Sequence, residues 1–103
     1  MLTPSETEMK IRVTQREQRN IKTTQITYAL YRVVTNLATY YAVEVSAANE
    51  HDMRMLGENC ERAEKLFEIL VNETVTPCTL RDVLHDTEIL EEEAKYRENL
   101  YKN

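Results

Sequence analysis

Two adjacent histidine–aspartate pairs are the residues of this 103-residue sequence that most readily suggest metal chemistry. They are His51-Asp52 and His85-Asp86. Imidazole and carboxylate groups bind divalent metal ions, and a metal-dependent phosphohydrolase needs such a pair together with a further His and a later Asp. No Asp follows Asp86. The pairs therefore leave a metal-dependent phosphohydrolase as a distant alternative, and we expect both aspartates to be helix caps or turn residues.

Carboxylates spaced one helical turn apart are the second candidate for metal binding. Glu58, Glu61 and Glu64 follow this spacing, and Asp82 and His85 form one further pair. A magnesium or di-iron site built on helices needs ligands from several such pairs, and the chain has no downstream Glu-x-x-Asp to supply them. We therefore expect a solvated helix face here. The sequence predicts no catalytic residue, no metal ligand, no cofactor and no enzymatic activity.

A basic segment in the first third of the chain is the strongest candidate for binding. Residues 1–50 carry a net charge of +1 and residues 51–103 a net charge of −6. Lysine and arginine neutralise phosphates and tyrosine stacks on bases, so the segment predicts a nucleic-acid- or nucleotide-binding module as an alternative function. The candidate ligand- or partner-binding residues are Lys10, Arg12, Arg16, Arg19, Lys22, Tyr28, Tyr31 and Arg32. A solvated face, or one that pairs with the acidic half of another subunit, would explain the same charges.

The composition indicates which elements position these residues. The chain has one glycine and two prolines, while charged residues make up 30%. Sheet proteins of this length need several tight turns, and tight turns favour glycine and asparagine. The shortage therefore predicts long helices with few connections. It also excludes a glycine-rich phosphate loop.

The first element is predicted as a basic amphipathic helix over residues 4–20. Thr3-Pro4-Ser5-Glu6 has the order of a capped helix start with proline in the first turn. Met9, Ile11 and Val13 alternate with polar residues, which is a strand pattern. A lone strand would have only its copy in another subunit to pair with. The helix is therefore preferred.

The central segment, residues 24–72, is predicted as a helical hairpin or one long helix. Its apolar residues recur every three or four positions, as on one face of a helix. Arg32 and Asn36 lie inside the most apolar stretch, which argues against a membrane span. The unusual length of a single helix favours the hairpin. The residues expected in the core or in an oligomer seam are Ile26, Leu30, Val33, Leu37, Tyr41, Met53, Leu56, Cys60, Ala63, Phe67 and Leu70.

The last element is predicted as an acidic helix over residues 77–101, which begins after Thr76-Pro77. The two cysteines, Cys60 and Cys78, form no Cys-x-x-Cys motif and are expected as free thiols. No apolar leader resembling a signal peptide is present in "MLTPSETEMK". These features predict a cytoplasmic protein.

Together these patterns predict a single all-α domain over residues 1–103, a small bundle of three to four helices with a central hairpin. The two long apolar stripes exceed what one hairpin can cover, so we expect a homo-oligomer, a dimer or higher, and no membrane partner. The predicted function is that of a small, non-enzymatic binding protein, a regulator, inhibitor or adaptor that contacts a protein partner through helical surfaces. Viral and mobile-element accessory proteins are often of this kind.

Overall fold

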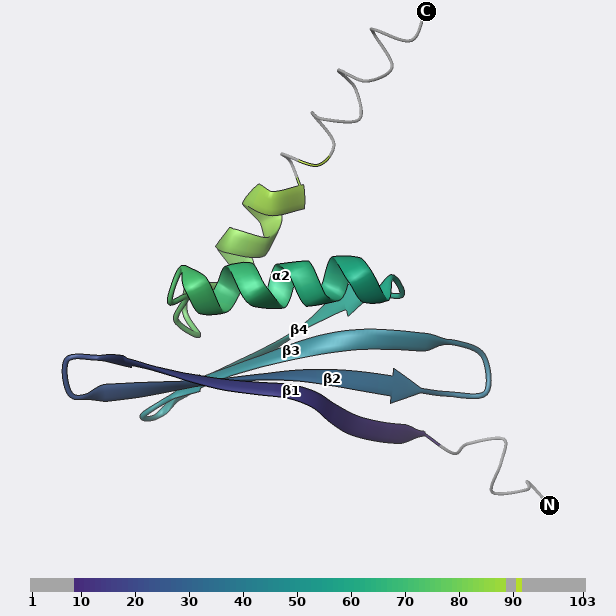
Figure 1. The fold of residues 1–103 in the computed structure, drawn as a ribbon, viewed down its shortest axis with the longest axis horizontal. Helices are drawn as coiled ribbons and strands as arrows, with labels where there is room; N and C mark the ends of the chain where they lie inside the picture. The colour runs from purple at the N-terminus through teal and green to yellow at the C-terminus, as the bar shows by residue number, and fades with distance from the viewer. Residues whose placement is uncertain (1–8, 89–90, 92–103) are drawn as a thin grey trace, which may run out of the picture.

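A computed structural model of the chain describes residues 9–88 and Glu91. Four strands form an antiparallel sheet in the order β1-β2-β3-β4. They are β1 (Lys10–Ile21), β2 (Thr24–Val34), β3 (Thr39–Ala47) and β4 (Glu50–Gly57), and the helix α2 (Cys60–Asn72) follows. Figure 1 shows α2 lying across one face of the sheet, with a shorter helical segment over residues 80–88 beyond it.

The prediction of an all-α bundle is wrong, because the described chain is mostly antiparallel sheet. The segment expected as a basic helix over residues 4–20 contributes most of β1. The segment expected as a helical hairpin over residues 24–72 contains β2, β3, β4 and α2. Within the predicted helix 77–101, residues 80–88 and Glu91 are helical, and the other residues after 88 lie outside the described part.

Strand alternation explains why β2 and β3 form a sheet instead of a helix. Ile26, Tyr28 and Leu30 are at most 1% exposed and occupy alternate positions of β2. Val43 and Val45 of β3 are fully buried and pair directly with Leu30 and Tyr28. Successive strand residues point to opposite faces, so these five side chains share one face. Four of the five are β-branched or aromatic, which suits a half-buried strand.

The hairpin turns are formed without glycine, which is why the scarcity of glycine misled the prediction. Two-residue loops join β1 to β2 and β3 to β4, and each begins with a residue at positive φ, Lys22 at 55° and Ala48 at 49°. This conformation costs a non-glycine residue roughly 1–2 kcal/mol. The β2–β3 loop is closed by Thr35, whose Oγ1 accepts hydrogen bonds from the backbone N–H groups of Leu37 and Ala38 at 3.2 and 3.1 Å.

The only glycine marks the place where the sheet ends and the helix begins. Gly57 has a φ of 89°, and the β3–β4 register shifts between Tyr41 and Ala42 next to it. A side chain at this φ would be strained. Asn59 then caps α2 by accepting a hydrogen bond at its Oδ1 from the backbone N–H of Arg62, at 2.9 Å. The chain thus reverses sharply and lays α2 back over the sheet.

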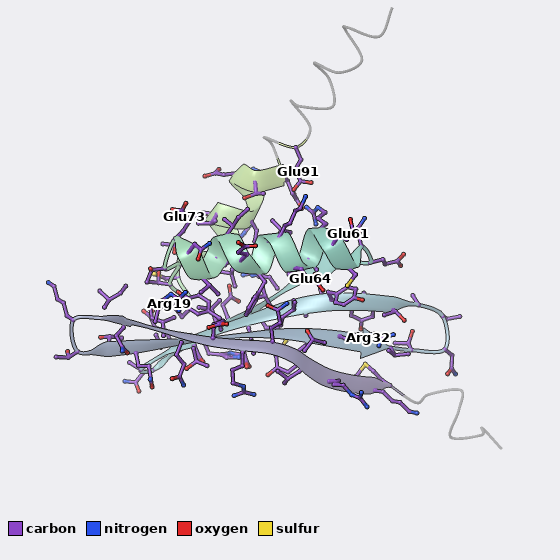
Figure 2. All side chains as sticks on the ribbon, viewed as in Figure 1. Arg19, Arg32, Glu61, Glu64, Glu73 and Glu91 are labelled. Atoms are coloured by element: carbon purple, nitrogen blue, oxygen red, sulfur yellow. The ribbon has the colours of Figure 1, made fainter. Side chains whose placement is uncertain are left out.

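The core lies between α2 and the face of the sheet that it covers. Figure 2 shows side chains from the helix and from this face filling the space between them. The buried face of α2 consists of Ala63, Leu66, Phe67, Leu70 and Val71. Val75 and Leu80 extend this core beyond the helix. The core is therefore a two-layer, helix-on-sheet arrangement.

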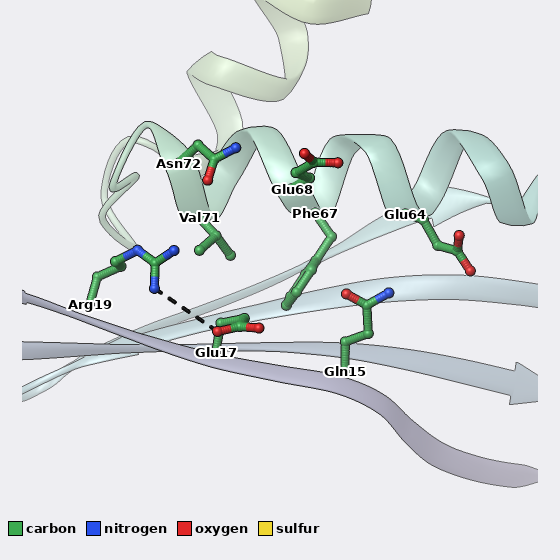
Figure 3. A pocket seen from close by; sticks show the side chains of 8 residues that line it. All are labelled: Gln15, Glu17, Arg19, Glu64, Phe67, Glu68, Val71 and Asn72. Carbon is green, nitrogen blue, oxygen red and sulfur yellow. Dashed lines mark ion pairs between the residues drawn. The ribbon is translucent and has the colours of Figure 1, made fainter.

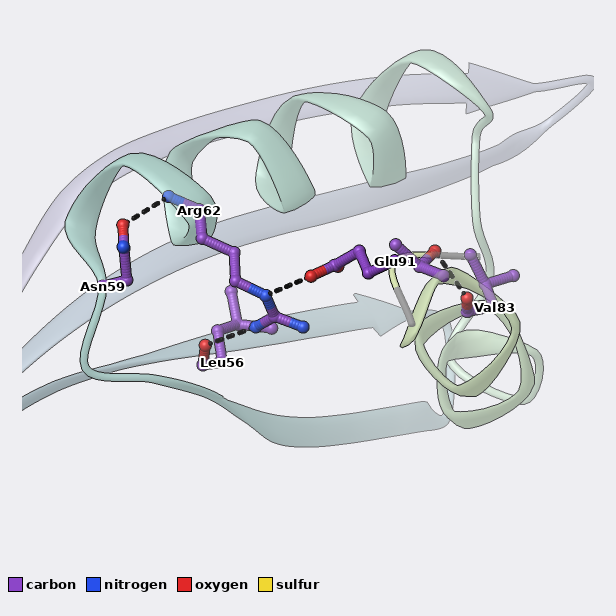
Figure 4. A network of polar contacts seen from close by, with 6 residues as sticks. Leu56, Asn59, Arg62, Val83 and Glu91 are labelled. Atoms are coloured by element: carbon purple, nitrogen blue, oxygen red, sulfur yellow. Dashed lines mark hydrogen bonds and ion pairs between the residues drawn. The ribbon is translucent and has the colours of Figure 1, made fainter. Parts of the chain in front are cut away.

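Arg62 links α2 to two other parts of the fold (Figure 4). Its Nη1 donates to the backbone carbonyl of Leu56 at 3.0 Å, and its Nε pairs with Glu91 Oε2 at 2.9 Å. Both side chains of the ion pair are about one-third exposed, 33% and 36%, so solvent screens the pair. The carbonyl contact fixes the end of β4 beneath the first turn of α2.

Tyr28 provides a sharp test of the helix-on-sheet core. Its hydroxyl donates to the backbone carbonyl of Val75 at 2.8 Å, and burial raises the pKa of this phenol. We expect Tyr28→Phe to lower the free energy of unfolding by about 1–2 kcal/mol, because the Val75 carbonyl loses its partner in a buried site. Urea denaturation measures the change. Tyr40→Phe is the control, because the structure records no hydrogen bond for the Tyr40 side chain. It should change the free energy of unfolding by less than about 0.5 kcal/mol. Equal losses in the two variants would contradict a stabilising hydrogen bond between Tyr28 and Val75.

Candidate functional site

The sheet has a covered face beneath α2 and a second face that no described element overlies, which we call the open face. Directly opposed residues of antiparallel strands project from the same side. The register therefore defines the rows of the open face: Ile11–Val33–Tyr40, Val13–Tyr31–Ala42–Met55, Arg16–Ala29–Glu44–Met53 and Gln18–Thr27–Ser46–His51.

The first two rows of the open face are mostly apolar; the first crosses three strands and the second crosses all four. Ala29 and Met53 are the apolar residues of the third row. Ile11 and Met55 are 57% and 58% exposed, and Val13 and Met53 are more than one-third exposed. Between them Ala29, Val33 and Ala42 are buried by their neighbours within the sheet. The exposed apolar side chains of the open face therefore lie on its two edge strands, β1 and β4, with buried apolar residues between them.

A polar network lies at the centre of the open face. The Tyr31 hydroxyl donates to Glu44 Oε1 at 2.8 Å, and His51 Nε2 lies 2.6 Å from Glu44 Oε2. The hydrogen bond from His51 is the main reason that the pKa of Glu44 is lowered. Tyr31 and Arg16 also lower this pKa, whereas desolvation raises it. The hydrogen bond to Glu44 raises the pKa of Tyr31. Glu44 is thus held as a carboxylate that orients two neighbouring side chains.

This network does not assemble a nucleophile. Ser46 lies directly opposite His51 in the β3–β4 register, and a Ser–His–Glu arrangement would need a hydrogen bond between the serine hydroxyl and the imidazole. The structure records no such bond between these two described residues. The network instead provides fixed polar groups beside the apolar rows, which is the composition of a protein interface.

A groove of about 280 Å³ lies between β1 and α2 on the covered face (Figure 3). Phe67 and Val71 line its buried side, and Glu64 and Glu68 lie along α2. Among the described residues that line the groove, Arg19 is the one cation, and it lies 4.0 Å from Glu17. Arg19 is therefore paired within an acidic groove.

The structure separates the cations of the basic segment into four places, the first of which is the groove that holds Arg19. Lys10, Arg12 and Arg32 lie together on the covered face at one end of the sheet, where they line a hollow of about 210 Å³. Arg16 lies on the open face, opposite Ala29. Lys22 is in the β1–β2 turn. The sequence-predicted binding tyrosines are also divided, because Tyr28 is in the core and Tyr31 is on the open face.

The predicted helical seam is not formed, and its residues are distributed over both faces of the sheet. Seven of them lie in the covered core: Ile26, Leu30, Tyr41, Leu56, Ala63, Phe67 and Leu70. Val33 is buried on the open face. Leu37 is 97% exposed in the β2–β3 loop, Met53 is on the open face, and Cys60 is an exposed free thiol at the start of α2. Cys78 is likewise free and exposed.

The two histidine–aspartate pairs do not come together. His51 and Asp52 are consecutive residues of β4 and project from opposite faces. Asp52 pairs with Arg54 at 3.0 Å. Within the described residues no group of three or more His, Cys, Asp or Glu side chains is placed to hold a metal ion. None of the helices described here combines the length and apolar character that a membrane crossing requires.

The sequence-based prediction missed most of the open face. Ile11, Val13, Tyr40, Glu44 and Met55 were not among the candidate binding residues. The alternation of Met9, Ile11 and Val13 with polar neighbours was the signal that could have found part of it. Glu44 and His51 gave no comparable signal, because they come from different strands and meet only through the β3–β4 register.

The network makes the pH dependence of the open face testable. Because the folded-state pKa of Glu44 is lowered, its contribution to stability is complete above the pH range in which an ordinary glutamate titrates, and it is lost as the pH falls through the lowered pKa. We expect His51→Ala to raise the pKa of Glu44, measured by carboxyl NMR titration. His85→Ala, in the helical segment 80–88, should leave that titration unchanged. An unaltered Glu44 titration in His51→Ala would show that the 2.6 Å contact does not hold in solution.

The comparisons with known proteins bear on the family alone. No curated protein and no solved structure matches the chain. One family model matches residues 5–89, which is more than half of the sequence and includes all four strands and α2. The chain therefore belongs to the family described as a family of unknown function, DUF6514.

Proposed function

We propose that this protein is a small, non-enzymatic, cytoplasmic binding protein that acts by protein–protein contact through the open face of its sheet. The observation that supports this is the pair of mostly apolar rows, which exposes Ile11, Val13 and Met55, together with the exposed Met53 in the next row. Contact through a sheet face replaces the contact through helical surfaces that the sequence suggested. A regulator, inhibitor or adaptor needs such a surface and no catalytic residue.

The first occupant that we propose for the open face is a second copy of the chain. Four strands about 4.8 Å apart and rows spread over about eight residues give a flat area of roughly 500 Å². A contoured surface exposes more than its flat area. The flat area is below the roughly 800 Å² that each partner contributes to a standard interface, but two such faces together reach the total of about 1,000 Å² expected of a specific interface.

The charges of the open face also suit a twofold dimer. Arg16 is on β1 and Glu44 is on β3, in the same row and on either side of Ala29 in β2. A twofold axis that runs along β2 in the plane between two stacked sheets places β1 of one copy over β3 of the other. Each Arg16 then faces a Glu44, and the small side chain of Ala29 lies at the axis. Such an interface is self-complementary, as twofold symmetry requires.

The alternative function, a nucleic-acid- or nucleotide-binding module, has less support from the fold. A surface that follows a nucleic-acid backbone needs its cations on one side. The fold puts Arg12 and Arg16 on opposite faces of the sheet and pairs Arg19 with Glu17. Protein contact through the open face is therefore the better-supported proposal.

Substitutions that introduce a charge into the apolar rows test the proposal. We expect the wild-type protein to be a dimer at tens of micromolar by analytical ultracentrifugation. Val13→Glu and Ile11→Glu, both on β1 and therefore over β3 of the partner in this dimer, should raise the dimer dissociation constant at least about tenfold, because each would bury an unpaired carboxylate. Both positions are more than one-third exposed in the single chain, so the variants should fold, which circular dichroism checks.

Leu37→Glu is the matched control, because Leu37 is an exposed apolar residue outside the open face. It should leave the dimer intact. A wild-type monomer would exclude the second copy as occupant. A different protein whose binding is lost in Ile11→Glu would then identify the open face as a site for an unlike partner. A wild-type dimer that both open-face variants leave unchanged would contradict the proposal.

A further inference from the structure

Two arginines face each other across neighbouring strands at one end of the covered face. Arg12 of β1 is directly opposite Arg32 of β2, and Lys10 is opposite Val34 on the same side of the sheet. All three cations are exposed. Within the described part of the chain, the structure records no hydrogen bond or ion pair for any of them. Figure 2 shows Arg32 at the sheet below the end of α2 that carries Glu61 and Glu64, yet neither carboxylate pairs with it.

This arrangement is unfavourable for the protein alone. Like charges directly opposite each other on adjacent strands destabilise a sheet. Of the five other described arginines, three are ion-paired with a carboxylate: Arg19 with Glu17, Arg54 with Asp52 and Arg62 with Glu91. The cluster of Lys10, Arg12 and Arg32, which we call the basic cluster, departs from this pattern. A bound anion would remove the repulsion.

The basic cluster lines a hollow of its own. Lys10, Arg12, Arg32 and Val34 enclose about 210 Å³. This volume is smaller than the roughly 300 Å³ from which pockets for drug-sized ligands begin. It therefore suits a compact anionic group and leaves any larger attached group outside the hollow.

We propose that the basic cluster is a binding site for a phosphate group. Two guanidinium groups offer planar, bidentate hydrogen bonding that matches phosphate oxygens, and the ammonium group of Lys10 adds a third charge. The phosphate comes either from inorganic phosphate or from the terminal phosphate of a nucleotide. The site lies on the opposite face of the sheet from the proposed protein-contact surface, so it does not depend on that proposal.

The test compares three arginine variants in sodium phosphate and in sodium chloride of equal ionic strength. We expect phosphate to raise the melting temperature of the wild-type protein, since a ligand that binds only the folded state stabilises it. Arg12→Gln and Arg32→Gln should melt about 1–4 °C higher than wild type in chloride, because the repulsion is relieved. Both variants should lose the rise caused by phosphate, and titration calorimetry should show at least about tenfold weaker phosphate binding.

Arg19→Gln is the matched control, because it removes one charge from the same face of the same strand but from beside Glu17. It should gain no stability in chloride and should keep the phosphate effect. A phosphate effect that persists in Arg32→Gln, or that is lost equally in Arg19→Gln, would overturn the proposal. A wild-type protein that phosphate does not stabilise would overturn it as well.

Three further experiments identify the source of the phosphate and test competing explanations. If the wild-type protein binds a nucleoside triphosphate more tightly than inorganic phosphate, and Arg32→Gln loses this binding, the ligand is a nucleotide. Equal binding of the two would identify the free anion. If oligonucleotide binding is weakened equally by substitution of Arg12, Arg16 or Arg19, the cations act as a general basic surface and not as a discrete phosphate site. Glu6 and Glu8 precede β1 outside the described residues. If the double variant Glu6→Gln and Glu8→Gln lowers the melting temperature in chloride, these carboxylates neutralise the basic cluster and the proposal is wrong.

Discussion

The described helical layer covers only one of the two faces of the sheet, and the rest of the structure follows from this constraint. α2 buries the side formed by Ile26, Tyr28, Leu30 and their partners on β3. The Tyr28 hydroxyl, bonded to the Val75 carbonyl, and Arg62, bonded to the Leu56 carbonyl, hold the helical layer in place. No described element covers the other side. Its apolar rows therefore meet water unless another molecule covers them.

The properties of β1 explain why a partner is expected on a face and not along the edge of the sheet. Every residue of β1 is exposed, and five of its twelve residues are charged. Its register with β2 shifts at Thr14, whose Oγ1 donates to the backbone carbonyl of Leu30 at 3.2 Å. Charged side chains and bulges are features by which proteins prevent strand addition at an edge. The open face carries no comparable protection, because Val13 and Met55 lie exposed within it.

Local sequence patterns could predict burial better than they could predict the elements. Ile26, Leu30, Phe67 and Leu70 were expected in the core or in an oligomer seam of a helical bundle, and they are buried in the core between helix and sheet. Apolar residues are buried in either kind of element. The stripe from Ile26 to Tyr41 fits a helix by spacing, and the β-branched and tyrosine residues between those positions fit a strand by type. The decisive turns use Lys22 and Ala48 at positive φ, residues that give no turn signal in a sequence. The Tyr31–Glu44–His51 network depends on strand register, which single-sequence patterns do not supply.

The bulge at Thr14 determines where the charges of the basic segment lie. In a regular strand, Lys10, Arg12 and Arg16 would share one face, because side chains alternate with a period of two. The register shift between Val13 and Gln15 reverses the alternation, so Arg12 remains opposite Arg32 while Arg16 lies opposite Ala29. One inserted residue thus leaves Lys10 and Arg12 with Arg32 on the covered face and places Arg16 in the same row as Glu44 on the open face. The same bulge that blunts the edge of the sheet therefore separates the proposed anion site from the proposed protein-contact surface.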